Sequence, residues 1–173
     1  MGEATLDALH ARLAAYDGRT TSELTAIAED WSDDAGYCAA LITLAGSDEG
    51  HVANGATWLI KAALEGEGAF SPAEIDQLID TLPALMDWAA QLHVAQSLRL
   101  LDLPQARGQE IAEWLTPLLT HKRPFLRAWA LDGMAHLARS LEGFDAEFTA
   151  ALGAALEDDA ASVRARARNL AGG

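Results

Sequence analysis

Residues 118–130 read LLTHKRPFLRAWA, and residues 155–167 read ALEDDAASVRARA. Each stretch contains two apolar residues, a short polar turn, an aliphatic residue followed by arginine, and an alanine four positions after the aliphatic residue. The two aliphatic residues, Leu126 and Val163, lie 37 positions apart. Because a recurring pattern at a fixed spacing is typical of repeat architectures, these stretches predict two copies of one structural unit.

Two weaker copies precede these stretches. Val52 takes the aliphatic position of one copy, with Ala56 four residues later, and Gln91 takes that position in the other copy. The four positions are then spaced 39, 35 and 37 residues apart. Units of two helices that repeat every ~40 residues are typical of α-helical solenoids.

The composition independently favours an all-α fold. Alanine occurs 37 times and leucine 26 times, whereas valine occurs three times and isoleucine six times. Alanine and leucine are strong helix formers, and strands favour β-branched residues that this chain largely lacks. Apolar residues at helical spacing, with short polar connections, predict ten helices. We expect them at about residues 3–16, 20–31, 34–45, 49–65, 72–82, 84–101, 107–120, 124–141, 144–156 and 159–171.

The two C-terminal copies resemble the HEAT repeat, whose pattern is a leucine pair, an aspartate-containing turn, and then valine, arginine and small residues. Asp158, Val163 and Arg164 match that pattern. The earlier copy departs from it, because His121 replaces the turn aspartate and Leu126 replaces valine. The resemblance is specific for architecture, since the matching residues are structural in that family.

The resemblance implies an all-α superhelix, or solenoid, of about four antiparallel HEAT-like helix pairs that follow an N-terminal helical segment. We expect residues 1–173 to form a single domain, because no connection is long enough to separate two. The N-terminal segment would cover residues 1–33. The repeat units would cover residues 34–66, 71–102, 107–141 and 144–171.

Charge and cysteine content exclude several classes of protein. The chain has 173 residues, a formal net charge of −14 and one cysteine, Cys38. The acidity disfavours nucleic acid and anionic membranes as partners. One cysteine excludes an internal disulfide, and together with the absence of a secretory signal it predicts a cytoplasmic protein. No apolar run approaches the ~18 residues of a membrane-spanning helix.

No pattern of residues points to catalysis. The chain lacks a glycine-rich phosphate loop, and Cys38 lies in an apolar segment without a basic neighbour. Some HEAT proteins hold iron through His-Glu dipeptides, and none occurs in this sequence. We therefore predict no catalytic residues, no metal site and no cofactor, and we favour a protein that is not an enzyme.

Basic residues concentrate in the second half of the chain. Residues 1–86 hold 15 acidic and 3 basic residues, whereas residues 87–173 hold 11 and 9. Arg127 and Arg164 occupy matching repeat positions, and Arg168 shares a helix face with Arg164. Tryptophan is common at binding hot spots and also fills gaps between helices. The candidate partner-binding residues are Trp58, Arg127, Trp129, Arg164 and Arg168.

Each of these candidates has a structural alternative. In HEAT-like repeats the turn aspartate bonds to backbone or to the motif arginine, so Asp158, Arg164 and Arg127 could tie repeats together. Trp58 and Trp129 could belong to the core. The sequence leaves both alternatives open.

The predicted function is a non-catalytic scaffold that binds another protein along its concave face. One alternative is a HEAT-like protein that acts on nucleic acid or a small molecule, as DNA glycosylases and chromophore lyases of this type do. Trp129 and Asp132 near Arg127 suggest the glycosylase comparison, which the overall acidity opposes. A third possibility is a self-associating structural module, and thus a homo-oligomer.

Overall fold

The computed structural model describes residues 2–66 and 68–172. These residues form ten α-helices, three short 3-10 helices and no strand, which confirms the predicted all-α class. The α-helices are α1 (Gly2–Ala14), α2 (Thr21–Trp31), α3 (Tyr37–Ala45), α4 (Gly50–Glu65), α5 (Pro72–Thr81), α6 (Trp88–Ser97), α7 (Gly108–Leu118), α8 (Pro124–Ser140), α9 (Asp145–Leu156) and α10 (Ala161–Ala171). The 3-10 helices are η1 (Leu82–Ala84), η2 (Leu98–Leu100) and η3 (Gln105–Arg107).

Helix α6 is shorter than predicted, and its boundaries have local causes. The sequence predicts one helix over about residues 84–101, but η1 and η2 flank a ten-residue α6. Asp87 caps the start of α6, because its carboxylate accepts hydrogen bonds from the backbone N–H groups of Ala89 and Ala90. The residues before Asp87 form a separate turn, in which Leu82 and Leu85 are buried and Met86 is exposed.

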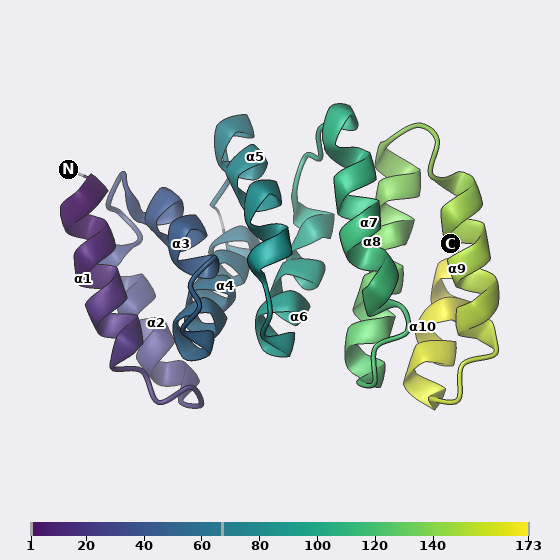
Figure 1. Ribbon diagram of the computed structural model, residues 1–173, viewed down its shortest axis with the longest axis horizontal. Helices are drawn as coiled ribbons and strands as arrows, with labels where there is room; N and C mark the ends of the chain where they lie inside the picture. Colours follow the sequence, from purple (N-terminus) through teal and green to yellow (C-terminus); the bar gives the residue numbers. More distant parts are fainter. Residues whose placement is uncertain (1, 67, 173) are drawn as a thin grey trace. The chain divides into compact units, whose positions relative to one another are not determined.

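The chain divides into two compact units, unit 1 up to Leu100 and unit 2 from Leu101 onward. In unit 1, α1, α3 and α5 are neighbours in one layer, and α2, α4 and α6 are neighbours in a second layer (Figure 1). Helix α4 links the layers, because it packs against α1 and α3 as well as against α2 and α6. The expectation of a single domain stays a prediction.

Close approach of helices in unit 1 depends on one glycine. A Cβ atom at Gly55, in the middle of α4, would lie 2.7 Å from Cδ2 of Leu13 on α1. Glycine therefore allows α4 to pack directly onto the large side chains of α1. All four early helices contribute fully buried side chains to the core of unit 1, including Leu9, Leu13, Leu24, Ile27, Leu41 and Leu59.

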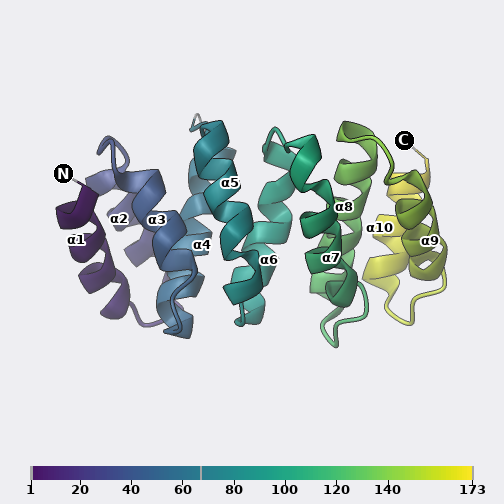
Figure 2. The ribbon, with the colours of Figure 1, turned by 45° about the horizontal axis from the view of Figure 1, so that its top comes forward.

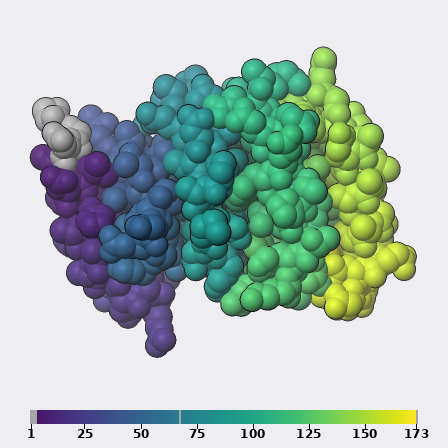
Figure 3. Space-filling view, in the orientation of Figure 1, coloured from purple at the N-terminus to yellow at the C-terminus, as the bar shows by residue number. Residues whose placement is uncertain are grey.

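Unit 2 is organised around α8, which packs against α7, α9 and α10 (Figure 2). The buried part of its α8–α9–α10 core uses mostly small side chains: Ala128, Leu131, Ala155, Val163 and Ala167. Side chains close most of the gaps that the ribbon leaves between the helices of each unit (Figure 3). Small core residues allow close helix packing but bury little apolar area each, so polar ties between helices gain importance.

The strongest such tie joins Arg127 on α8 to Asp158, in the turn between α9 and α10. Arg127 Nε donates to Asp158 Oδ2 at 2.8 Å, and Nη2 donates to Oδ1 at 2.7 Å. A third bond runs from Nη1 to the backbone oxygen of His121 at 2.9 Å. Both side chains of the pair are about nine-tenths buried. The bond from Arg127 lowers the pKa of Asp158 to about 2. Arg127 thus ties neighbouring helices together, which is the structural role that the sequence analysis left open beside partner binding.

We expect Arg127→Gln to lower the free energy of unfolding by about 2 kcal/mol, because it leaves the Asp158 carboxylate without its bidentate partner. Arg168→Gln is the matched control, since Arg168 is exposed on α10 and should change stability by less than about 0.5 kcal/mol. Urea unfolding at pH 7 measures both values. Equal stabilities of the two variants would contradict this role of Arg127.

The same tie predicts a pH dependence. The pKa of Asp158 is lowered by folding, so the ionised form stabilises the native state above the unfolded value of roughly 3.9. That stabilisation is lost as the pH falls toward about 2. The stability difference between the wild type and Asp158→Asn should therefore be constant from about pH 7 to pH 5 and shrink below about pH 4. A difference that stays constant to about pH 3 would show that the pKa is not lowered.

Candidate functional site

The five residues predicted to bind a partner occupy both units. Trp58 is half-buried on α4 in unit 1. In unit 2, Arg127 is largely buried and Trp129 is partly buried on α8, whereas Arg164 is partly buried and Arg168 is exposed on α10. Arg164 Nη1 donates to the backbone oxygens of Asp158 and Asp159, so this side chain also makes internal contacts. Their role in partner binding stays a prediction.

Trp129 is held in a small network that the sequence analysis missed. The guanidinium carbon of Arg166 lies 4.5 Å from the Trp129 ring centroid, which is a cation–π distance. Arg166 Nη2 also lies 2.8 Å from Oδ1 of Asp132, a buried carboxylate on α8. Trp129 and Asp132, the residues that suggested a glycosylase-like surface, therefore connect α8 to α10 through Arg166.

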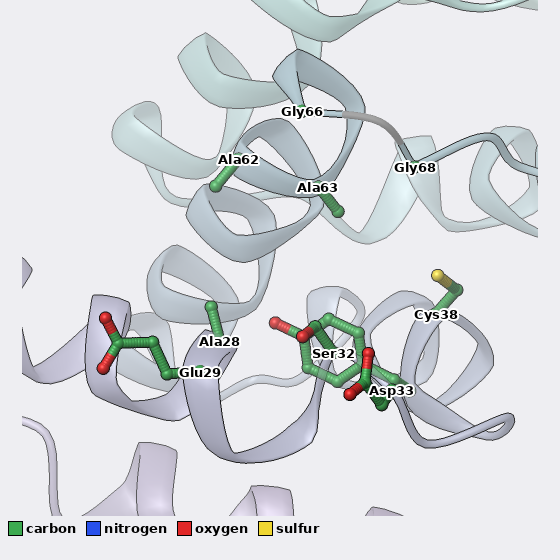
Figure 4. Close-up of a pocket in the computed structure, with 10 residues that line it drawn as sticks. Ala28, Glu29, Ser32, Asp33, Cys38, Ala62, Ala63, Gly66 and Gly68 are labelled. Carbon is green, nitrogen blue, oxygen red and sulfur yellow. The ribbon is translucent and has the colours of Figure 1, made fainter.

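One candidate binding site is a cavity of about 500 Å³ in unit 1. It lies where α2 and α4 end and α3 begins (Figure 4). Most of the surface that lines it is apolar. The lining residues are Ala28, Glu29, Ser32, Asp33, Tyr37, Cys38, Ala62, Ala63, Gly66 and Gly68.

Small residues at the end of α4 produce this cavity. Ala62 and Ala63 face it with methyl groups only, on the side opposite Ser32 and Asp33 (Figure 4). After α4 the chain turns back close to the helix, since the Gly68 N–H donates to the backbone oxygen of Ala63 at 3.2 Å. A Cβ atom at Gly68 would lie 2.7 Å from that oxygen, so the turn requires glycine.

Tyr37 lines the cavity and carries an unpaired hydroxyl that lies covered behind the cavity surface. Its side chain is 3% exposed, and its hydroxyl is the one buried side-chain polar atom in the described part of the chain without a hydrogen-bond partner. Burial raises the pKa of Tyr37 to about 12, and the neighbouring Cys38 adds to the increase, so the phenol stays neutral. An unpaired buried hydroxyl costs about 1–3 kcal/mol, which makes this atom a point where a bound molecule would gain a hydrogen bond.

The charged groups around the cavity are acidic. Glu29 and Asp33 are the charged side chains that line it, and both are exposed. The Glu29 carboxylate extends outward at the rim, whereas Asp33 lies beside Ser32 (Figure 4). Burial, and then the negative charge of Glu74, raise the pKa of the Cys38 thiol above its ordinary value. Cys38 is therefore a neutral thiol near pH 7, and the cavity is suited to binding rather than to nucleophilic catalysis.

The turn before α6 presents exposed apolar side chains that the sequence analysis also missed. Met86 is 85% exposed and Trp88 is 39% exposed. The turn between them is held firmly, because Asp87 caps α6 and Gln91 Nε2 donates to the backbone oxygen of Leu85 at 2.8 Å. The sequence contains a signal for this turn, namely an aspartate that can cap a helix, Asp87, between two large apolar residues. It was overlooked because one continuous helix was predicted over residues 84–101.

Residues 2–66 and 68–172 contain neither a cluster of metal ligands nor a membrane-spanning helix. No group of three or more histidine, cysteine, aspartate and glutamate side chains there has an arrangement that could hold a metal ion. None of the helices in that part of the chain combines the length and apolar character needed to cross a membrane.

Comparison with protein-family models gives no match to this chain. Comparisons with curated proteins and with solved structures likewise find no similar protein.

One histidine, His93, lies in a buried environment between two helices. His93, on α6, lies against α4, where its Nδ1 atom is 3.2 Å from the Thr57 hydroxyl oxygen. Thr57 is fully buried and also donates to the backbone oxygen of Ala53. Burial, and then the positive charge of Lys61, lower the pKa of His93 to about 4.

We expect the wild type to lose stability between about pH 7 and pH 5, because His93 accepts a proton only when the chain unfolds. The unfolded pKa is roughly 6.5, so this loss should reach about 1–2 kcal/mol at about pH 5. His93→Gln should remove that component of the pH dependence, whereas His10→Gln should retain it, since His10 is a more exposed histidine paired with Glu49. Urea unfolding at both pH values gives the slopes. Identical slopes for the wild type and His93→Gln would contradict a neutral buried imidazole.

Proposed function

We propose that the protein is a non-catalytic, HEAT-like scaffold that binds a basic segment of another protein on unit 1. The exposed pair Met86 and Trp88, held on a rigid turn within a strongly acidic unit, carries this proposal. The single cysteine supports a cytoplasmic setting for that role.

Contacts in unit 2 support the HEAT-like part of the proposal. Arg127 and Arg164 lie at matching repeat positions, and each donates through Nη1 to the backbone oxygen six residues earlier, at 2.9 Å and 2.5 Å. Arg127 also reaches forward to Asp158, the turn aspartate of the next helix pair. Equivalent residues with equivalent contacts are what a repeated unit would produce.

Charge favours a basic partner. Residues 1–100 hold 16 acidic and 4 basic residues, a net charge of −12, whereas residues 101–173 hold 10 and 8. A field of that sign attracts a lysine- or arginine-rich segment at long range and repels acidic ones. In unit 2, Arg127, Arg164 and Arg166 are engaged in internal bonds, so the basic residues there are less available to a partner.

Met86 and Trp88 supply the apolar part of such a surface. Aromatic residues and methionine are enriched in protein interfaces relative to the remaining surface. The bonds made by Asp87 and Gln91 hold the backbone between them, so little ordering would be needed when a partner binds. Trp58, Trp129 and Arg168 remain candidate contact residues, but the proposal does not depend on them.

The test is an affinity purification with quantitative mass spectrometry, using the full chain and a Met86→Ser/Trp88→Ala variant as baits in lysate of the source cell. Phe125→Ala is the matched control, because Phe125 is 57% exposed but belongs to unit 2. We expect a protein with a basic segment whose recovery falls at least tenfold with the double variant and with added salt, and is unchanged with Phe125→Ala.

Three outcomes would contradict the proposal. Equal recovery of every captured protein by the wild type and the double variant would remove Met86 and Trp88 from the interface. Recovery of nuclease-sensitive material alone would favour the nucleic-acid alternative. Recovery of the bait alone, with a mass in solution that rises with concentration, would favour self-association.

A further inference from the structure

We propose that the cavity formed by the ends of α2 and α4 and the start of α3 binds a small organic cation, namely an amine with a compact apolar body. The ammonium group would lie at Asp33, and the apolar body would lie against Ala28, Ala62 and Ala63. This site involves other residues and another class of ligand than the protein-binding surface at Met86 and Trp88, and it does not depend on that proposal.

The sign of the ligand charge follows from the groups that surround the cavity. The described residues that line it include two carboxylates, Glu29 and Asp33, and no lysine, arginine or histidine. Two helices, α2 and α4, direct their C-terminal ends toward it, and the partial negative charge of a helix C-terminus attracts cations. The N-terminus of the short helix α3 offsets one of these ends. The sum of the side-chain charges and the partial charges of the helix ends is negative, so it disfavours an anion.

The shape of the ligand follows from the wall. Three alanines supply methyl groups but no bulky side chain, so the wall offers apolar contact without filling the space. A volume of about 500 Å³ lies within the range of small-molecule sites. A compact aromatic or aliphatic body would bury apolar surface there, while the rim keeps Asp33 near water.

The hydroxyl of Tyr37 is the independent sign that the cavity receives a polar atom. This group is buried, neutral and unpaired in a residue that lines the cavity, although buried hydroxyls normally have a partner. An ammonium N–H could donate to the Tyr37 oxygen while it pairs with Asp33. Because the hydroxyl is covered, the ligand would displace part of the wall to reach it, and the new hydrogen bond favours that movement.

Cys38 offers a direct readout of occupancy, because it is the one cysteine of the chain and lines the cavity. The experiment follows the rate at which iodoacetamide alkylates Cys38 at about pH 8.5, where more of the thiol is ionised. Three probes share one body and differ in charge: 2-phenylethylamine, 2-phenylethanol and phenylacetate. We expect the amine to slow alkylation in a saturable way, at a concentration at least tenfold below that of the alcohol, and phenylacetate to have no effect.

Three variants of the full chain localise the interaction. Asp33→Asn and Tyr37→Phe should each weaken protection by the amine at least threefold. Asp30→Asn is the control, because Asp30 lies in the last turn of α2, pairs with Arg12 and does not line the cavity, so the amine should protect this variant as it protects the wild type. Tyr37→Phe should also unfold at a temperature equal to or above that of the wild type, because it removes an unpaired hydroxyl.

Several results would overturn the proposal. Equal protection by the amine and the alcohol would show that charge is not recognised. Amine protection that is unchanged in both Asp33→Asn and Tyr37→Phe would place the amine elsewhere. A clear loss of stability in Tyr37→Phe would show that the hydroxyl already has a partner. Failure of these tests would leave the affinity purification with Met86 and Trp88 unaffected, so the two proposals fail separately.

Discussion

The close packing of α4 governs unit 1. This helix contacts α1, α2, α3 and α6, and it does so with small residues, including Gly55 at the point nearest Leu13. A chain so rich in alanine gains limited apolar burial per residue, so helices must approach closely to gain dispersion contacts. Where the small residues meet large neighbours, as at Gly55, the core is tight. Where they meet other small residues, as at Ala62 and Ala63, space remains and a cavity forms.

In unit 2, ion pairs between helices add to the limited stabilisation that small apolar residues supply. The small residues of the α8–α9–α10 core are accompanied by two buried or half-buried ion pairs, Arg127 with Asp158 and Arg166 with Asp132. In the Arg127 pair, bidentate geometry and a further backbone acceptor satisfy the guanidinium donors, which is the condition under which such a pair offsets its desolvation. Arg127 and Arg166 therefore tie α8 to the α9–α10 turn and to α10, whereas the role of the predicted arginines in partner binding stays a prediction.

The helices were predictable because their signals are local. Alanine and leucine content, spacing of apolar residues and the capping box of Ser71 and Glu74 each act within a few residues, and the structure places a helix at every predicted position. The candidate cavity was not predictable. It depends on which side chains of three helices meet, and neither the unpaired hydroxyl of Tyr37 nor the exposure of Met86 has a signature in the order of residues.

The order of helix contacts has a consequence for how the chain folds. Within each unit, the main contacts join helices that are at most three apart along the chain, such as α1 with α4 and α8 with α10. Contacts of short sequence separation close small loops, so their entropic cost is low and contact order is low. Such topologies fold quickly, and a newly synthesised α1–α4 segment already contains the partners for most of its apolar faces before later helices emerge.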